Sequence, residues 1–306
     1  MQRGRTGFIS RIVYEFCPEF TWCNISFFYY LSIGCRSAER HLCAADTILA
    51  VSWSAKQYVI FEDERTRPVR DLLSALPAIE ARSAIDLGCG PGNSTELLAA
   101  RFPNAAVRGL DSSPDMIATA RRRLPRVQFE VGGIEGWNDA GPFDVILANA
   151  VLHWIPDHST LLPALVARLA SGGGLAIQMP DNLDAPTHRL MREVATDGPW
   201  APMLAAAAAT RTPIASADRY YELLRPLCSR VDIWRTTYHH PLPGGAAAIV
   251  EWFKGSGLVP FLEPLDAPLR AAYLERYTAA VARAYPPLPD GSVLLPFPRL
   301  FMVAIR

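Results

Sequence analysis

The chain has 306 residues, half of them hydrophobic and a fifth charged, which predicts a folded protein with a sizeable core. Thirty basic residues balance thirty acidic ones, which argues against a nucleic-acid-binding protein, because affinity for a phosphate backbone requires a basic surplus. Six irregularly spaced cysteines, none in a Cys-x-x-Cys pair, argue against a disulfide framework and against a metal site. The longest apolar run, residues 25–34, is too short to span a bilayer. These features predict a cytoplasmic protein with reduced thiols.

Residues 1–50 differ from the rest of the chain. They hold four of the six cysteines and show neither the period of a strand nor that of a helix. From Val51 the sequence becomes patterned and rich in alanine and leucine. Two hypotheses fit this N-terminal extension: an artefact of an upstream start site, with Val51 as the true initiator, or a disordered or partner-binding arm. We expect residues 51–306 to form the functional domain.

Beyond Val51, short apolar runs alternate with helical patterns. Pro114 follows two serines and marks the start of one helix, where its missing N–H costs nothing. Strands that alternate with helices predict an α/β fold, with a parallel sheet covered on both faces. The expected strands are 83–87, 106–110, 127–131, 143–148 and 175–179, and the expected helices are 93–102, 114–123 and 160–170.

After residue 180 the alternation breaks. A strand-like segment covers 231–240, and the chain ends in another strand at 299–305. Helical insertions between the late strands of an open sheet typically lie over the edge where ligands bind. We therefore expect a cap, formed mainly by residues 183–228 and 242–290, instead of an independent domain. Its expected helices are 185–196, 203–209, 246–255 and 268–285.

The strongest local signal is the segment 86–92, Asp-Leu-Gly-Cys-Gly-Pro-Gly, between an expected strand and an expected helix. Its glycines permit a tight turn and a close approach to a ligand. The next strand ends at Asp111, whose carboxylate suits the two hydroxyls of a ribose. A dinucleotide fold requires G-x-G-x-x-G, whereas this G-x-G-x-G spacing with Asp86 ahead of it suits the ammonium and sulfonium groups of S-adenosyl-L-methionine. The pattern resembles the first motif of class I methyltransferases.

Residues 143–154 resemble the fourth-strand motif of the same superfamily, after which the chain lies near the reacting methyl group. They lack the Asn/Asp-Pro-Pro-Tyr-like clamp of enzymes that methylate nucleobases, which argues against a nucleobase substrate. His153 and Trp154 are candidates to line the substrate pocket, with a packed core position as the alternative for each.

Segments outside these shared motifs resemble the trans-aconitate 2-methyltransferase family: Tyr58 with 61–68, then 178–182, 191–194, 231–238 and 296–301. The resemblance covers about residues 53–306. It implies a Rossmann-like class I methyltransferase sheet, mostly parallel with the last strand antiparallel, and helical cap insertions in the C-terminal half. It also implies methyl transfer from S-adenosyl-L-methionine to one carboxylate of trans-aconitate or a similar small tricarboxylate, which gives a monomethyl ester.

The charge of such an acceptor indicates which side chains its binding site needs. A carboxylate is ionised at neutral pH, so no catalytic base is expected, and catalysis depends on positioning. A trianion needs cations, and the arginine fork suits carboxylates. Arg235 and Arg299, in the matching motifs, are the main candidates, with a structural ion pair as the alternative for each. Weaker candidates are Tyr238, His239 and Lys254.

The resemblance also implies a set of cofactor contacts. The family places an acidic residue after the third strand to bind the adenine amino group, but this chain has Gly133 there. Backbone groups or Glu135 are expected to substitute. The implied cofactor-binding residues are Tyr58, Asp86, Gly88, Cys89, Gly90, Gly92, Asp111, Ser112, Met116, Ile134, Glu135 and Asn149.

Two other functions remain open. A methyltransferase acting on a different acid, a phenol or an amine is favoured if the pocket proves neutral instead of cationic. A non-catalytic nucleoside-binding module is disfavoured by the intact Asp86, the three glycines and Asp111. The expected partner is a small polycarboxylate, without nucleic acid or membrane, and the chain is expected to be a monomer or a weak homo-oligomer.

Overall fold

The computed structural model describes residues 61–306 apart from 140 and 210. These residues belong to one structural unit, Leu49–Arg306. The predictions for residues 1–50 and for Tyr58 lie outside the described residues. No described helix is both long and apolar enough to cross a membrane.

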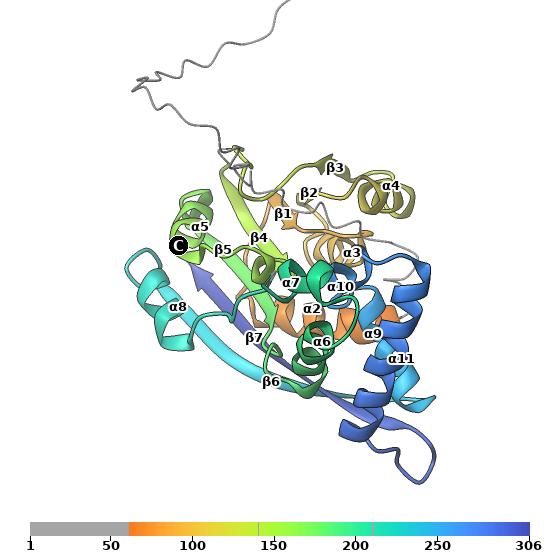
Figure 1. Cartoon of the computed structure of the whole chain (residues 1–306). Coiled ribbons are helices and arrows are strands. Elements are labelled where there is room, and N and C mark those ends of the chain that lie inside the picture. The colour runs from red at the N-terminus through yellow and green to blue at the C-terminus, as the bar shows by residue number, and fades with distance from the viewer. Residues whose placement is uncertain (1–60, 140, 210) are drawn as a thin grey trace, which may run out of the picture. The chain divides into compact units, whose positions relative to one another are not determined.

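The described residues form a seven-stranded sheet in the order β3-β2-β1-β4-β5-β7-β6 (Figure 1). The first five strands run parallel, whereas β7 is antiparallel to both β5 and β6. The predicted α/β fold, with a mostly parallel sheet and an antiparallel last strand, is confirmed. The strands are β1 (Ser83–Leu87), β2 (Ala106–Asp111), β3 (Gln128–Val131), β4 (Phe143–Asn149), β5 (Leu169–Pro180), β6 (Arg230–Leu242) and β7 (Val293–Ile305).

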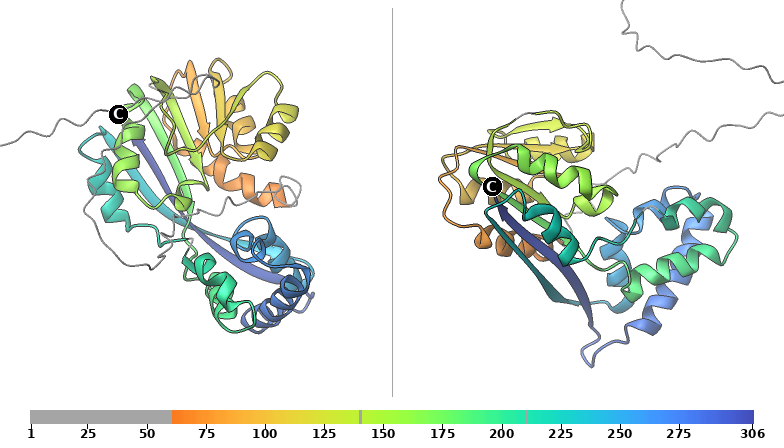
Figure 2. Two further views of the ribbon diagram at one scale, coloured as in Figure 1. Left: turned by 45° about the horizontal axis from the view of Figure 1, so that its top comes forward. Right: turned by 90° about the vertical axis from the view of Figure 1, so that its left-hand side faces the viewer.

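Helices cover both faces of the sheet (Figure 2). On one face, α2 (Glu62–Ala75) and α3 (Asn93–Arg101) pack against the strands through a core that includes Leu72, Leu98 and Phe301. On the other face, α5 (His158–Ala167) and α8 (Ala217–Leu224) share a core with Ile177 and Met302. The remaining elements near the sheet are α4 (Pro114–Arg123), beside β2 and β3, and the short 3-10 helix η2 (Leu152–Trp154) after β4.

A separate helical group packs where β6 and β7 extend beyond their neighbours. It has its own core, which includes Trp252, Tyr273 and Tyr277 with Phe297 of β7. Figure 2 shows these helices gathered around the far ends of the two long strands. The helical group consists of α6 (Pro186–Thr196), α7 (Ala201–Ala209), α9 (Gly245–Lys254), α10 (Val259–Leu262) and α11 (Ala267–Ala284).

The structure differs from the expected elements in several places. Leu169 pairs with Phe143 and begins β5, so the helix expected at 160–170 ends early. The sequence pattern does not indicate α2, α8 or α10. Although α8 lies within the range expected for the cap, it packs against α5 and β6. The helix expected at Pro114 is present, and the Ser113 hydroxyl caps it by accepting a hydrogen bond from the Met116 N–H at 3.4 Å.

Candidate functional site

Several buried polar side chains share one face of the sheet, where β1, β4 and β5 end. Residues paired across neighbouring strands point to the same face, as do residues two apart along one strand. Asn149 pairs with Gln178, and Pro180, two residues after Gln178, pairs with Arg299. Asp86 pairs with Leu147, which lies two residues before Asn149. The side chains on this face, each less than a tenth exposed, are those of Asp86, Asn149, Gln178 and Arg299.

Asp86 is fully buried at the end of β1. Its Oδ2 atom accepts hydrogen bonds from the hydroxyls of Ser94 and Thr95, both at 2.7 Å, in the first turn of α3. Its Oδ1 atom has no hydrogen-bond partner among the described residues. Burial raises the pKa of Asp86 to about 7, although the two hydroxyls oppose this shift. A buried acceptor oxygen of this kind is suited to a cationic group of a ligand.

The glycines of the loop after β1 lie in different environments, one closely packed and one beside open space. Gly88, Gly90 and Gly92 have φ angles of 68°, 55° and 92°, which other residues rarely adopt. A Cβ atom at Gly88 would lie 2.4 Å from the Val151 side chain, so this glycine permits close packing. At Gly90 a Cβ atom would meet no described atom within 4 Å. The backbone at Gly90 therefore borders open space into which a ligand can fit.

Asp111 links the glycine loop to the start of α4. Its Oδ2 atom accepts the Gly90 N–H and its Oδ1 atom accepts the Ser113 N–H, each at 2.9 Å. Burial raises the pKa of this carboxyl group, against the effect of the two N–H donors. Each carboxylate oxygen can accept more than one hydrogen bond, so Asp111 can still receive hydroxyl groups from a ligand. The neighbouring Ser112 side chain is exposed.

The other predicted cofactor residues fall into two groups. Cys89 is 1% exposed and packs in a small core with α4, where burial raises the pKa of its thiol, and Met116 is also buried. Ile134 is buried, whereas Glu135 is exposed. The Glu135 Oε2 atom lies 3.6 Å from the position that a Cβ atom of Gly133 would take. A carboxylate is therefore present beside the position where the expected acidic residue is missing.

The turn after β4 carries His153 and Trp154. It includes Ala150 at φ 54°, an uncommon backbone conformation for a residue with a Cβ atom. His153 is 7% exposed, and its Nδ1 atom has no hydrogen-bond partner among the described residues. Burial, and then the charges of Arg211 and Arg299, hold the His153 pKa well below its ordinary value, so the ring is neutral at pH 7.

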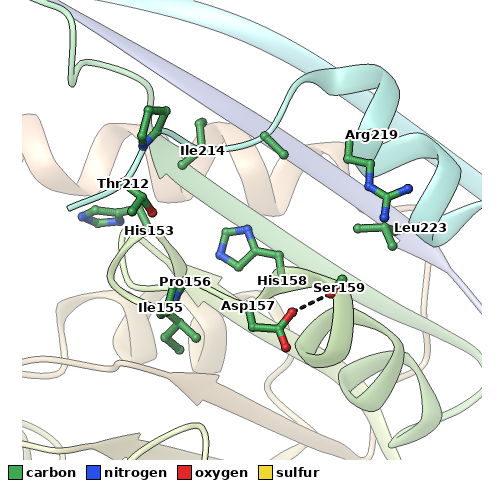
Figure 3. Close-up of a pocket in the computed structure, with 12 residues that line it drawn as sticks. His153, Ile155, Pro156, Asp157, His158, Ser159, Thr212, Ile214, Arg219 and Leu223 are labelled. Carbon is green, nitrogen blue, oxygen red and sulfur yellow. Dashed lines mark hydrogen bonds between the residues drawn. The ribbon is translucent and has the colours of Figure 1, made fainter. Parts of the chain in front are cut away.

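His153 also lines a cavity of about 220 Å³ between the turn after β4, the start of α5 and residues 212–215. Figure 3 shows His153 and Arg219 at opposite ends of the view of this cavity. His158 lies between them, and Asp157 accepts a hydrogen bond from Ser159. The cavity therefore reaches from the buried His153 toward α8.

The structure does not bring the two predicted arginine anchors together. Arg299 is 4% exposed, donates a hydrogen bond to Gln178 Oε1 at 3.0 Å and lies over the Phe297 ring. Arg235 pairs with Leu300 and so points to the opposite face of the sheet, where it is exposed. There its Nε atom forms an ion pair with Asp181 at 2.7 Å.

The weaker candidates also have other roles in the structure. The buried Tyr238 hydroxyl donates to Asp71 at 2.6 Å. His239 lies one residue further along β6, so it points to the opposite face and is exposed. Lys254 forms an ion pair with Glu251 at the end of α9.

Arg211 is a candidate that the sequence analysis did not identify. Its Nη1 atom donates to Asn182 Oδ1 at 3.4 Å and lies 3.1 Å from His188 Nε2. Its guanidinium group lies over the Trp154 ring, 5.5 Å from the centroid. Because Arg211 follows an alanine-rich run and belongs to no motif, no local signal identifies it.

Some buried polar atoms of the site have no hydrogen-bond partner among the described residues, and they are acceptors on one side of the site and donors on the other. At the ends of β1 and β4 they are acceptors, Asp86 Oδ1 and Asn149 Oδ1. Beside β5 they are donors, Gln178 Nε2 and Arg211 Nε. Since buried polar groups are normally satisfied, this arrangement suits a ligand that is cationic on one side and anionic on the other.

Comparisons with known proteins agree with these features. A family model described as a methyltransferase domain matches residues 84–173. The trans-aconitate 2-methyltransferase of Methylobacterium nodulans is 59% identical over 254 residues, which cover 83% of this chain and 98% of that protein. The trans-aconitate 2-methyltransferase of Rhodopseudomonas palustris is 56% identical over 254 residues, 83% of this chain and 99% of that protein. Among solved structures, the YcgJ protein from Bacillus subtilis aligns with a TM-score of 0.52 at 11% identity, over 78% of this chain and 98% of that one, a likeness of fold alone.

Proposed function

Because the chain belongs to the trans-aconitate 2-methyltransferase family, we propose that it methylates one carboxylate of trans-aconitate or of a similar small tricarboxylate. The chain has the class I methyltransferase fold and is an S-adenosyl-L-methionine-dependent methyltransferase. When bound, S-adenosyl-L-methionine supplies an electrophilic methyl group, and transfer to a carboxylate oxygen gives the monomethyl ester and S-adenosylhomocysteine.

The residues around the glycine loop fit this cofactor. The open space at Gly90 supports close approach of the ligand to the backbone. Asp111 would accept the ribose hydroxyls, and the Asp86 and Asn149 oxygens that lack described partners would accept the ammonium group. Glu135 would bind the adenine amino group, because its carboxylate lies beside Gly133. Further contacts are proposed for Gly88, Cys89, Gly92, Ser112, Met116 and Ile134, and Tyr58 remains a prediction.

The observation that carries the proposal is the group of buried donors beside β5. Arg299 and Gln178 lie next to each other there, and Arg211 lies beside Asn182, which follows the same strand. Buried guanidinium groups bind carboxylates with charge-assisted hydrogen bonds. We propose that these three side chains and His153 orient the acceptor, and that the cavity beside His153 admits it.

The chain's own residues contribute positioning instead of proton transfer. An acceptor carboxylate is already ionised near neutral pH, so no proton has to leave. The neutral His153 can donate or accept one hydrogen bond to the acceptor without taking a proton from it. Burial of the surrounding polar groups keeps competing water away from the reacting oxygen. We further propose that the helical group acts as the cap over this edge of the sheet.

A phenol or amine acceptor is the weaker candidate, since it needs a base and gains little from buried arginines. A non-catalytic module is also weaker, because the glycine loop and Asp111 keep the geometry that cofactor binding requires. The expected partner is a small polycarboxylate. A cytoplasmic location stays a prediction.

The test is a methyl-transfer assay with labelled S-adenosyl-L-methionine over a panel of tricarboxylates, dicarboxylates, phenols and amines. We expect the label to appear as a base-labile monomethyl ester of trans-aconitate or of a closely related tricarboxylate, identified by mass spectrometry. Label transfer only to a phenol or an amine, or cofactor binding without transfer to any acceptor, would contradict the proposal.

A further inference from the structure

Two arginines line a small, partly open space between η2, α6 and α10. The space has a volume of about 20 Å³, which is room for one oxygen atom of a carboxylate, a group of about the size of a water molecule. Among the residues that line it, Trp154, His188, Arg192 and Arg211 have polar side chains. Arg192 belongs to the 191–194 segment, which resembles the family but has no assigned role in binding.

Neither arginine has an acidic partner in the part of the chain that the structure describes. Arg192 donates to the Leu183 carbonyl at 3.0 Å, and Arg211 contacts Asn182 and His188. Burial, and then the charge of Arg192, lower the pKa of Arg211 to about 10, so the Arg211 guanidinium group stays charged at neutral pH. Two like charges held together in a partly buried space are unfavourable unless an anion joins them.

This pair of arginines adjoins the proposed acceptor site. Asn182 and Leu183 follow directly after β5, and Trp154 follows His153. The guanidinium group of Arg211 lies over the ring of Trp154, the residue after His153. Arg299 donates to Gln178, which pairs with Asn149 at the end of the strand that precedes His153. An acceptor next to His153 can therefore extend one carboxylate toward Arg211 while another remains near Arg299.

We infer that Arg192 and Arg211 form a carboxylate subsite, which holds an acceptor carboxylate other than the one that is methylated. The inference rests on the proposed function and names the feature of the acceptor that this side of the site recognises. An acid without that carboxylate would leave the two guanidinium groups unneutralised. Sites built around such buried charges discriminate strongly against ligands that lack the matching group. The subsite therefore selects polycarboxylates over monocarboxylates.

The test compares Arg192→Gln and Arg211→Gln with Arg189→Gln as a matched control. Arg189 lies on the same helix as Arg192, but it is exposed and forms an ion pair with Glu193. We expect the first two variants to raise the KM for trans-aconitate at least about tenfold, and the control to leave it unchanged. Affinity for S-adenosyl-L-methionine, measured by calorimetry, should be the same in all three.

A second measurement identifies the carboxylate that is bound. Mesaconate, itaconate and cis-glutaconate each lack one carboxylate of trans-aconitate, and their inhibition constants are measured against wild type and Arg192→Gln. For the acid that lacks the carboxylate held by the subsite, the substitution should have no effect, whereas the other two should lose affinity. Equal losses for all three acids, or none for any acid including trans-aconitate, would overturn the inference.

Thermal melts of each variant show whether it is folded, so that a raised KM is not mistaken for a loss of folded protein. Arg192 is half-buried and its hydrogen bond is to one carbonyl, so Arg192→Gln is expected to fold even if Arg211→Gln does not. A wild-type protein that methylates no tricarboxylate would refute the proposed function itself. A wild-type protein that methylates trans-aconitate, with variants of unchanged KM, would refute the subsite alone.

Discussion

The carboxyl group of Asp86 is buried in the free protein, and its protonation is therefore coupled to folding. Its pKa rises from 3.8 to about 7. The unfolded chain releases this proton at lower pH than the folded protein, so the free energy of unfolding should fall as pH rises from about 4 to about 7. Asp86→Asn should reduce this slope while it keeps an oxygen for Ser94 and Thr95. Thermal melts of the cofactor-free protein between pH 5 and pH 8 measure the effect.

Cofactor binding should show the opposite dependence on pH. An ionised Asp86 is needed to attract an ammonium group, so affinity for S-adenosyl-L-methionine should increase as pH rises through about 7. In Asp86→Asn the affinity should be lower and should lose this dependence. Calorimetry at pH 6 and pH 8 tests this, with the exposed Asp218→Asn as the control. Wild-type affinity in the variant would remove Asp86 from the cofactor site.

Arg235 and Arg299 lie on neighbouring strands, but their replacement by lysine should change the KM for the acceptor to very different extents. Arg299→Lys keeps the buried charge but loses the planar fork, so the acceptor KM should rise roughly tenfold. Arg235→Lys, on the opposite face and exposed, should leave it unchanged. Steady-state kinetics with each substrate varied in turn separates the acceptor KM from that of the cofactor. Similar effects of the two substitutions would mean that Arg299 has only a structural role.

At the scale of elements, the loop between β1 and α3 combines packing with ligand approach. Gly88→Ala would place a methyl group against Val151, and we expect a loss of roughly 2 kcal/mol or more in unfolding free energy. Gly90→Ala meets no described neighbour and should cost only about 1–2 kcal/mol of backbone strain. Its methyl group would enter the open space and weaken cofactor binding at least about tenfold.

Denaturant unfolding and calorimetry distinguish the two glycine substitutions. The interpretation predicts that Gly88→Ala is mainly a folding defect and Gly90→Ala mainly a binding defect. If Gly90→Ala binds S-adenosyl-L-methionine as tightly as wild type, the space at Gly90 is not the cofactor site.

Elements were predictable where their pattern is local. The strands are short, largely apolar or β-branched runs between turn residues, and their positions agree with expectation to within one or two residues, apart from the early starts of β5 and β7. The helix α2 was missed because its first turns are charged and Pro68 lies within it, and its buried face appears only against the sheet. The eight-residue α8 was missed because only Tyr220 and Leu224 of its residues are buried.

For the molecule as a whole, methyl transfer within the complex of enzyme, cofactor and acceptor should need no proton-transferring group that titrates near neutrality, although Asp86 changes the affinity for the cofactor in this range. With both substrates saturating, we expect the rate to be nearly constant between about pH 6 and pH 8, because the acceptor is ionised and the His153 pKa lies well below this range. Stopped assays across this range, with saturation checked at each pH, provide the measurement. A steep rise governed by a single pKa near 7 would indicate a base and a phenol or amine acceptor.

The sequence by itself determined the α/β class, the glycine loop and the acidic strand ends, because alternating apolar runs and left-handed glycines are local properties of the chain. The tertiary structure decided which charged side chains meet. Arg235 and Arg299 lie on opposite faces because strand pairing and the two-residue period assign their directions. Arg192, on α6, and Arg211, which follows α7, line the same space because these two helices pack against each other, and no local sequence pattern shows that contact.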